Sequence, residues 1–243
     1  YTSTSDAGDF DIDGYNNANT LQYNYGHDSM GECVANYGAS AADTGNVFRY
    51  NICSNNAQDG GLAYQGDVLV YSWSGGSFNG LQIYNNTFYW NPISSVQLLA
   101  PNYGPANFAG TNPNFFKNNI IYSTAPQMIP TAPPVTLDNN IYFYTGGNPI
   151  WRWNGTDYSS LAAYQAASGQ DLHSMSKDPL LNNPTYHSTG KPTSAFTLQR
   201  GSPAIGAGTN VCQGISGCSM GTHDFYGNPL PANGVGLNIG AYQ

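Results

Sequence analysis

The sequence predicts an all-β protein, a right-handed parallel β-helix (a solenoid) with one short helix and a C-terminal cap. Two observations support this fold class. A five-residue pattern built on asparagine recurs five times before residue 142, and the 243 residues include 29 Gly, 15 Pro and 19 Tyr but only 8% charged residues. Chains rich in Gly, Asn and Tyr and poor in Lys and Glu form strands and turns more readily than helices.

The recurring pattern reads apolar, any residue, any residue, Asn, and then usually apolar. It occupies residues 21–25, 48–52, 83–87, 116–120 and 137–141. Its asparagines are 27, 35, 33 and 21 residues apart, which fits coils of about twenty residues with insertions of variable length. In a parallel stack, an inward Asn can bond to the backbone and to the Asn one coil away. A β-sandwich with asparagines at its turns is the alternative, but it does not require the same register five times.

Further strand candidates lie between the asparagine motifs, so each coil is expected to hold two or three short strands. They cover residues 9–13, 33–35, 61–64, 68–71 and 96–99. Three longer loops are expected to project from one side, where they could wall a groove. These loops are residues 39–45, 75–80 and 101–113.

The repeat fades after Asn140, and a helix pattern follows. Residues 159–168 predict the one helix, with Asp157 or Ser159 as its N-cap and Gly169 just beyond its end.

The C-terminal stretch predicts an end cap, because a solenoid must hide its last coil. The chain is long enough for one sizeable core and shows no flexible linker, so residues 1–243 are interpreted as a single domain. Coils are expected over about residues 9–150, and the helix and cap over about residues 151–243.

Charge and hydropathy exclude two classes of partner. The net charge is −8 and the six Lys and Arg residues are scattered, so no basic stripe is present to bind the phosphates of nucleic acid. No run approaches the roughly 18 apolar residues that span a bilayer, so no membrane is expected as a partner either.

The cysteines and two sequons predict secretion. Cys212 and Cys218 are six residues apart and are expected to form one disulfide, which leaves Cys33 and Cys53 as the second pair. Disulfides persist in oxidising compartments, and N-glycosylation occurs on secreted proteins. The sequons begin at Asn85 and Asn154.

The run from Phe10 to Asp28 resembles a coil of secreted right-handed parallel β-helix proteins of the pectate-lyase-like superfamily. Later segments resemble the tail that such proteins share: residues 169–174, 178–179, 202–205, 224–229 and 239–242. The resemblance covers nearly the whole chain and implies the fold, but for the reaction it is weak, since the superfamily includes lyases, hydrolases, epimerases and proteins without known activity.

This chain departs from the superfamily pattern at several positions. Asn238 and Gln243 stand where acidic residues are usual, and Gly26 and Ser29 replace the common Ser and Asn near His27. In such proteins several coils and an N-terminal cap precede the first coil seen here. Either the first coils are missing, cleaved away or supplied by another chain, or this is an unusually short solenoid; a trimmed fragment is the favoured interpretation. A monomer is expected unless a separate N-terminal part completes the helix.

The candidate catalytic residues lie on the predicted strand at residues 9–13 and in the turn that follows the first asparagine motif. If Phe10 and Ile12 point inward, then Asp9, Asp11 and Asp13 line the outer face, where crowding raises the pKa of at least one carboxyl or recruits Ca²⁺. A solvated acidic edge or a purely structural calcium site is the alternative for this strand.

Stacking of successive coils is expected to bring three further titratable residues near the aspartates. These are His27, Asp28 and Glu32, so the candidate catalytic set is Asp11, Asp13, His27, Asp28 and Glu32. A structural bend histidine is the alternative for His27. Residues 171–173 are interpreted as part of the tail's structure.

Four more residues are candidates for substrate binding. Arg49 occupies the repeat position of Gln22 one coil on and could hold a sugar hydroxyl or carboxylate, unless it pairs with Asp28 or Asp59. Asp59 could extend the cluster or mark a turn. Tyr15 and Tyr37 offer rings on which sugars stack, although packing inside the coil is the alternative for such aromatics.

These residues predict an enzyme that degrades a polysaccharide, and the scarcity of basic residues favours a glycoside hydrolase with paired carboxylates. The alternatives are a polysaccharide lyase acting on a uronate polymer and a non-catalytic glycan-binding or cell-wall protein.

Overall fold

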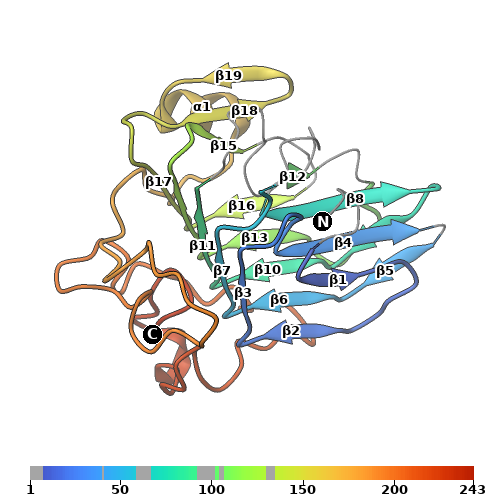
Figure 1. The fold of residues 1–243 in the computed structure, drawn as a ribbon. Coiled ribbons are helices and arrows are strands. Elements are labelled where there is room, and N and C mark those ends of the chain that lie inside the picture. Colours follow the sequence, from blue (N-terminus) through green and yellow to red (C-terminus); the bar gives the residue numbers. More distant parts are fainter. Residues whose placement is uncertain (1–7, 40, 59–66, 92–101, 104–106, 130–134) are drawn as a thin grey trace.

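The computed structural model describes residues 8–39, 41–58, 67–91, 102–103, 107–129 and 135–243. Within these residues the protein is all-β, with parallel sheets and one α-helix (Figure 1). None of the helices in this part of the chain has the length and apolar character needed to span a bilayer.

Three sheets hold most of the strands, and every strand pairing inside them is parallel. Sheet 1 contains β1 (Phe10–Ile12), β4 (Val34–Ala39), β8 (Val68–Trp73) and β12 (Asn102–Tyr103). Sheet 2 contains β2 (Thr20–Gln22), β6 (Val47–Arg49), β10 (Gln82–Tyr84), β13 (Phe115–Lys117) and β16 (Thr136–Asp138). Sheet 3 contains β3 (Tyr25–His27), β7 (Ile52–Ser54), β11 (Thr87–Trp90), β14 (Ile120–Ser123) and β17 (Ile141–Tyr144).

Two smaller sheets complete the strands. β5 (Ala42–Thr44) pairs in parallel with β9 (Ser77–Asn79). β15 (Gln127–Ile129) pairs with β18 (Ile150–Trp153), which forms a hairpin with β19 (Thr156–Tyr158). A short 3₁₀ helix, η1 (Ala232–Gly234), lies near the C-terminus.

The chain visits the three large sheets in the same order each time, and each passage is called a repeat below. β1, β2 and β3 are followed by β4, β6 and β7, and these by β8, β10 and β11, so that neighbours in a sheet come from successive repeats (Figure 1). This arrangement is compatible with a parallel β-helix. The predicted strands at residues 9–13, 33–35 and 68–71 correspond to β1, β4 and β8. Those at residues 61–64 and 96–99 lie outside the described residues.

The predicted asparagine ladder joins all five repeats where sheet 2 turns into sheet 3. The Nδ2 of each Asn donates to the Oδ1 of the next, over 3.0, 3.1, 3.0 and 3.4 Å. That same Oδ1 also accepts the preceding Asn's backbone N–H at 2.9–3.0 Å. The ladder residues are Asn24, Asn51, Asn86, Asn119 and Asn140. The ladder thus satisfies backbone groups that the bend leaves without strand partners.

The residue before each ladder Asn has a positive φ, which turns the chain sharply from one sheet to the next. The φ angles are 62° at Tyr23, 50° at Tyr50, 53° at Asn85, 56° at Asn118 and 54° at Asn139. Asn tolerates this left-handed region better than most residues do. The paired asparagines in the sequence motif therefore have two roles, the first turning the chain and the second forming the ladder.

The core is built by apolar side chains that lie in register across the sheets. Phe48, Ile83 and Phe116 follow one another in sheet 2 and are fully buried. Phe88 of sheet 3 packs between Phe48 and Phe116, with ring centroids 6.4 and 6.1 Å apart. The predicted disulfide between Cys33 and Cys53 is present and lies in this core.

The predicted helix is α1 (Leu161–Ser168), and it packs against the last repeat. Its N-cap is Ser160, whose hydroxyl accepts from the Ala163 N–H, so the assignment of the cap to Asp157 or Ser159 is wrong. Gly169 ends the helix in the left-handed conformation, as predicted. Tyr164 of α1 is buried and stacks on Trp151 of β18 at a centroid distance of 6.3 Å.

The C-terminal tail (residues 175–243) lies along the side of the molecule rather than over its end (Figure 1). Its Phe196, Phe225 and Ile239 bury Ile52 and Ile120 of sheet 3. The predicted disulfide between Cys212 and Cys218 is present, in a loop that covers part of sheet 2. The outer face of sheet 3 is apolar and needs a cover, which explains why the tail does not act as the predicted end cap. The last repeat is instead covered by α1 and β18.

Candidate active site

The candidate site forms where the first repeat leaves sheet 3. His27 ends β3, and its Nδ1 lies 2.8 Å from the Oδ2 of Asp28, which has a φ of 56°. The other oxygen, Oδ1, accepts from the Nδ2 of Asn55 at 3.0 Å. Tyr25 stacks on the His27 ring at a centroid distance of 4.7 Å. Sequence reasoning expected His27 and Asp28 near the aspartates of the first strand, and in the structure these two neighbours also contact each other.

A second histidine reaches the same carboxylate from the tail. The Nδ1 of His187 lies 3.2 Å from the Oδ2 of Asp28. The side chain of His187 is 76% exposed, compared with 27% for Asp28. Asp28 is therefore held between an imidazole of the first repeat and one of the tail. Sequence reasoning missed His187, since only the path of the tail brings it to this bend.

Asp9 lies beside this pair, over the strand that ends in His27. A Cβ on Gly26 would come within 2.5 Å of the Asp9 Oδ2, so Gly26 leaves the space that the carboxylate occupies. The Nδ2 of Asn56 donates to this same oxygen. The charges of His27 and Asp28 both act on Asp9.

The two carboxyl groups have pKa values displaced in opposite directions. Burial raises the pKa of Asp9 above its ordinary value, against the hydrogen bond from Asn56. At Asp28 burial also works to raise the pKa, but the hydrogen bonds from Asn55 and His27 and the charge of His187 outweigh it and lower the pKa. Such a divergence lets one group carry a proton while its neighbour is ionised.

The remaining acidic candidates have different settings from this pair. Ile12 is buried and Phe10 packs on the core, so Asp11 and Asp13 face outward as predicted. Asp13 accepts from the Gly14 N–H at 2.7 Å. Glu32 is 1% exposed and accepts from the Tyr37 hydroxyl at 3.5 Å, so it does not present a carboxylate to solvent.

The described residues contain no group of three or more His, Cys, Asp and Glu side chains that could hold a metal ion. Asp9, Asp11 and Asp13, the predicted calcium ligands, therefore do not form such a group.

The predicted substrate-binding residues are dispersed. The guanidinium of Arg49 donates to Gln22 Oε1 at 2.8 Å, to the Tyr84 hydroxyl at 3.0 Å and to the Ser219 carbonyl. Arg49 is thus occupied by neighbouring repeats and the tail, and neither predicted acidic partner is among these contacts. Tyr15 is 67% exposed.

Tyr37 packs edge-on against Tyr71 at 6.3 Å, on the outer face of sheet 1. Asp59 lies outside the described residues. A hollow of about 180 Å³ is lined by Phe108, Asn112 and Thr136, beside one of the loops that were expected to wall a groove. It contains none of the candidate residues.

One of the two predicted glycosylation sites is wrong. Asn85 is fully buried, and its Nδ2 donates to the carbonyls of Asn238 and Gly240 at 3.0 and 3.3 Å. The tail covers this amide, which leaves no space for a glycan. Asn154 is exposed at the turn between β18 and β19, so glycosylation there stays a prediction.

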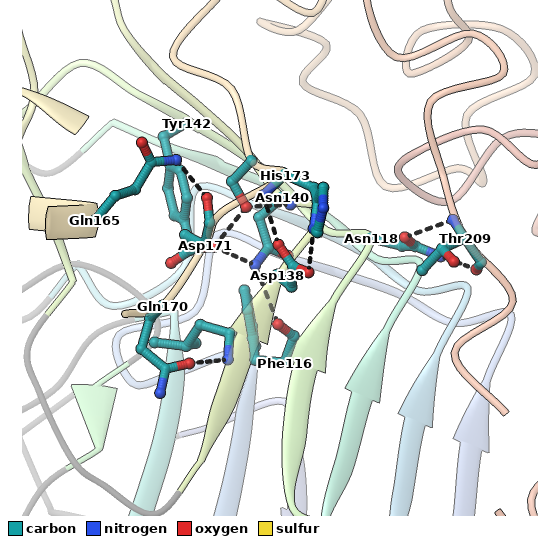
Figure 2. Close-up of polar contacts among 12 residues, drawn as sticks. Phe116, Asn118, Asp138, Asn140, Tyr142, Gln165, Gln170, Asp171, His173 and Thr209 are labelled. Carbon is teal, nitrogen blue, oxygen red and sulfur yellow. Dashed lines mark hydrogen bonds and ion pairs between the residues drawn. The ribbon is translucent and has the colours of Figure 1, made fainter. Parts of the chain in front are cut away.

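Asp171 has a structural role at the end of the ladder, as Figure 2 shows. This fully buried carboxylate accepts from Asn140 Nδ2, the Tyr142 and Tyr164 hydroxyls and the Ser174 hydroxyl. Burial raises its pKa to about 6, against the hydrogen bonds that it accepts. The structure thus supports the interpretation that this segment belongs to the tail's framework.

Asp138 and His173 form a second surface pair beside the ladder (Figure 2). The Nδ1 and backbone N–H of His173 lie 2.7 and 2.8 Å from the Asp138 carboxylate. The pair fastens the chain after α1 to the end of β16.

Asp67 is fully buried, and neither of its side-chain oxygens has a hydrogen-bond partner among the described residues. Burial and the charge of Asp9 raise its pKa well above the ordinary value. Because the pKa of Asp67 is higher in the folded than in the unfolded protein, the folded state binds its proton more tightly. The contribution of Asp67 to the free energy of unfolding is therefore most favourable at low pH and is lost as the pH rises above the unfolded pKa. Asp67→Asn is therefore expected to increase stability at pH 7 by more than about 1 kcal/mol, and much less at pH 4.

Urea unfolding of both proteins at the two pH values measures this difference. An Asp67→Asn protein that is less stable than the parent at pH 7 would contradict the assignment of Asp67 as an unpaired buried carboxyl.

In comparisons with known proteins, no protein-family model matches the chain, and no curated protein matches it.

Proposed function

We propose that this chain is a secreted right-handed parallel β-helix protein of the pectate-lyase-like kind that acts on polysaccharides. The parallel sheets visited in a fixed order, the asparagine ladder and the resemblance of residues 10–28 support the fold. The two disulfides support an oxidising, extracellular compartment.

The proposed reaction is hydrolysis of a glycosidic bond, with Asp9 as general acid and Asp28 as general base or nucleophile. One observation carries this proposal: the neighbouring carboxyls have pKa values displaced in opposite directions. In glycoside hydrolysis, one protonated carboxyl donates to the leaving oxygen while an ionised one activates water or attacks carbon. His27 and His187 orient Asp28 and stabilise its charge.

Asp9→Asn and Asp28→Asn are each expected to reduce product release from a polysaccharide by more than about 100-fold, because general acid–base catalysis contributes that much. Activity should fall at low pH as Asp28 becomes protonated, and at higher pH as Asp9 loses its proton. Reducing-end assays across a polysaccharide panel, with and without EDTA, measure both effects.

Asp157→Asn is the matched control, since it removes the same charge from a surface ion pair with Arg152 in the β18–β19 hairpin. Thermal unfolding verifies that all variants are folded. Full activity in Asp28→Asn would exclude this carboxylate as a catalytic group.

A second candidate function is non-catalytic glycan binding. It is favoured because several carboxylates each accept hydrogen bonds from groups of the protein itself. Asp138 accepts from His173, Asp157 from Arg152, and Asp224 from the backbone N–H groups of Tyr226, Asn228 and Gln243. Retardation in a polysaccharide gel without any released product would support this candidate over the hydrolase.

A further inference from the structure

We infer that the polymer accepted at the Asp9–Asp28 site is uncharged: a neutral polysaccharide or a methyl-esterified uronate, and not a free polyuronate. The inference rests on the proposed function and adds the substrate class. It follows from the groups that surround Asp9 and Asp28 and from the contacts that hold four of the six Lys and Arg residues.

The titratable groups at the site are two aspartates and two histidines. The charges of His27 and Asp28 act on Asp9, and the charges of His187 and His27 act on Asp28. Both histidines direct Nδ1 at Asp28 Oδ2, over 2.8 and 3.2 Å. Any positive charge that they carry is therefore directed at a carboxylate of the protein.

All six Lys and Arg residues belong to the described part of the chain, and four of them are held by other groups. Arg49 bonds Gln22, Tyr84 and Ser219, and Arg152 bonds Asp157. Lys191 donates to the Phe225 carbonyl at 2.9 Å and lies over its ring, while Lys117 lies over the Phe115 ring. The other two, Lys177 and Arg200, are exposed in the tail.

A uronate bound between Asp9 and Asp28 would bring its carboxylate to the ionised Asp28, and no Lys or Arg is among the groups that act on these two aspartates. The net charge of −8 adds a repulsive field over the whole surface. β-Elimination needs this carboxylate to be neutralised before the adjacent proton is removed. The same arrangement imposes no penalty on an uncharged sugar, whose hydroxyls can bond to the ionised Asp28.

Polygalacturonate and its fully methyl-esterified form provide a matched pair of probes, because they share a backbone and differ in charge. Product release at low ionic strength is expected to be at least about tenfold faster from the ester than from the free acid. Adding about 0.5 M NaCl should make the two rates of product release more similar, because salt screens the repulsion between the protein and the free acid. Neutral xylan, β-glucan and galactomannan complete the panel.

A gain-of-function variant tests the cause. Ser29 accepts from Asn56, the residue that also bonds Asp9, so Ser29→Lys adds a cation next to the site. This variant should raise the rate of product release from polygalacturonate towards the rate from the ester. The control Asp157→Asn should leave the ratio of these two rates unchanged. Equal rates on the acid and the ester for the parent protein at low salt would overturn the inference and leave the hydrolase proposal standing. Failure to cleave or bind any polymer in the panel would overturn both.

Discussion

Asn86→Ala is expected to lower the free energy of unfolding by about 3–5 kcal/mol, because it removes the middle of the ladder. The Asn86 amide is fully buried and donates to the carbonyls of Phe48 and Tyr84 and to Asn119 Oδ1. Its own Oδ1 accepts from the backbone and side chain of Asn51. Alanine leaves these groups buried without partners, in a space that is closed to water.

Chemical denaturation monitored by tyrosine and tryptophan fluorescence measures this loss. Asn91→Ala is the matched control, since Asn91 is exposed and accepts from the Thr124 hydroxyl, a single hydrogen bond among the described residues. The control should change stability by less than about 0.5 kcal/mol. Similar losses in the two variants would mean that the ladder does not stabilise the repeats.

Asp171→Ala is expected to cost about 3–5 kcal/mol at pH 4, because four donors lose their buried acceptor. These donors are the side chains of Asn140, Tyr142, Tyr164 and Ser174. The cost should be smaller at pH 7. The pKa of Asp171 is raised to about 6 in the folded protein, so its stabilisation is complete below the unfolded value of 3.8 and falls as the pH rises through about 6.

Thermal or urea unfolding at both pH values tests the sign as well as the size of the effect. Asp178→Ala is the control, since within the described part of the chain that exposed carboxylate accepts only a local hydrogen bond from the Leu180 N–H. A larger cost at pH 7 than at pH 4 would contradict the direction of the Asp171 pKa shift.

The repeat could be predicted from the sequence because the same physical demand recurs in every passage of the chain. Each bend needs an amide that bonds forward and backward, and an apolar residue three positions earlier that enters the core. Asn51 and Asn119 meet this demand in the same way, so the pattern was visible without an alignment. The number and spacing of the cysteines separately predicted both disulfides.

Contacts made by the tail could not be predicted, because no periodicity relates the tail to the surface that it covers. The burial of Asn85 and the arrival of His187 at Asp28 both depend on its path. The sequence also assigned Arg49 to a substrate, whereas Gln22 and Tyr84 of adjacent repeats hold it. Local sequence shows which side chains can bond, and long-range packing decides which of them do.

The central functional claim is hydrolysis directed by Asp28, and cleavage in ¹⁸O-labelled water tests it most directly. Mass spectrometry of the oligosaccharide products should show ¹⁸O at each new reducing end and no unsaturated ends. The Asp28→Asn protein should give no labelled products. Unsaturated ends without ¹⁸O, or unchanged ¹⁸O incorporation in Asp28→Asn, would contradict the account.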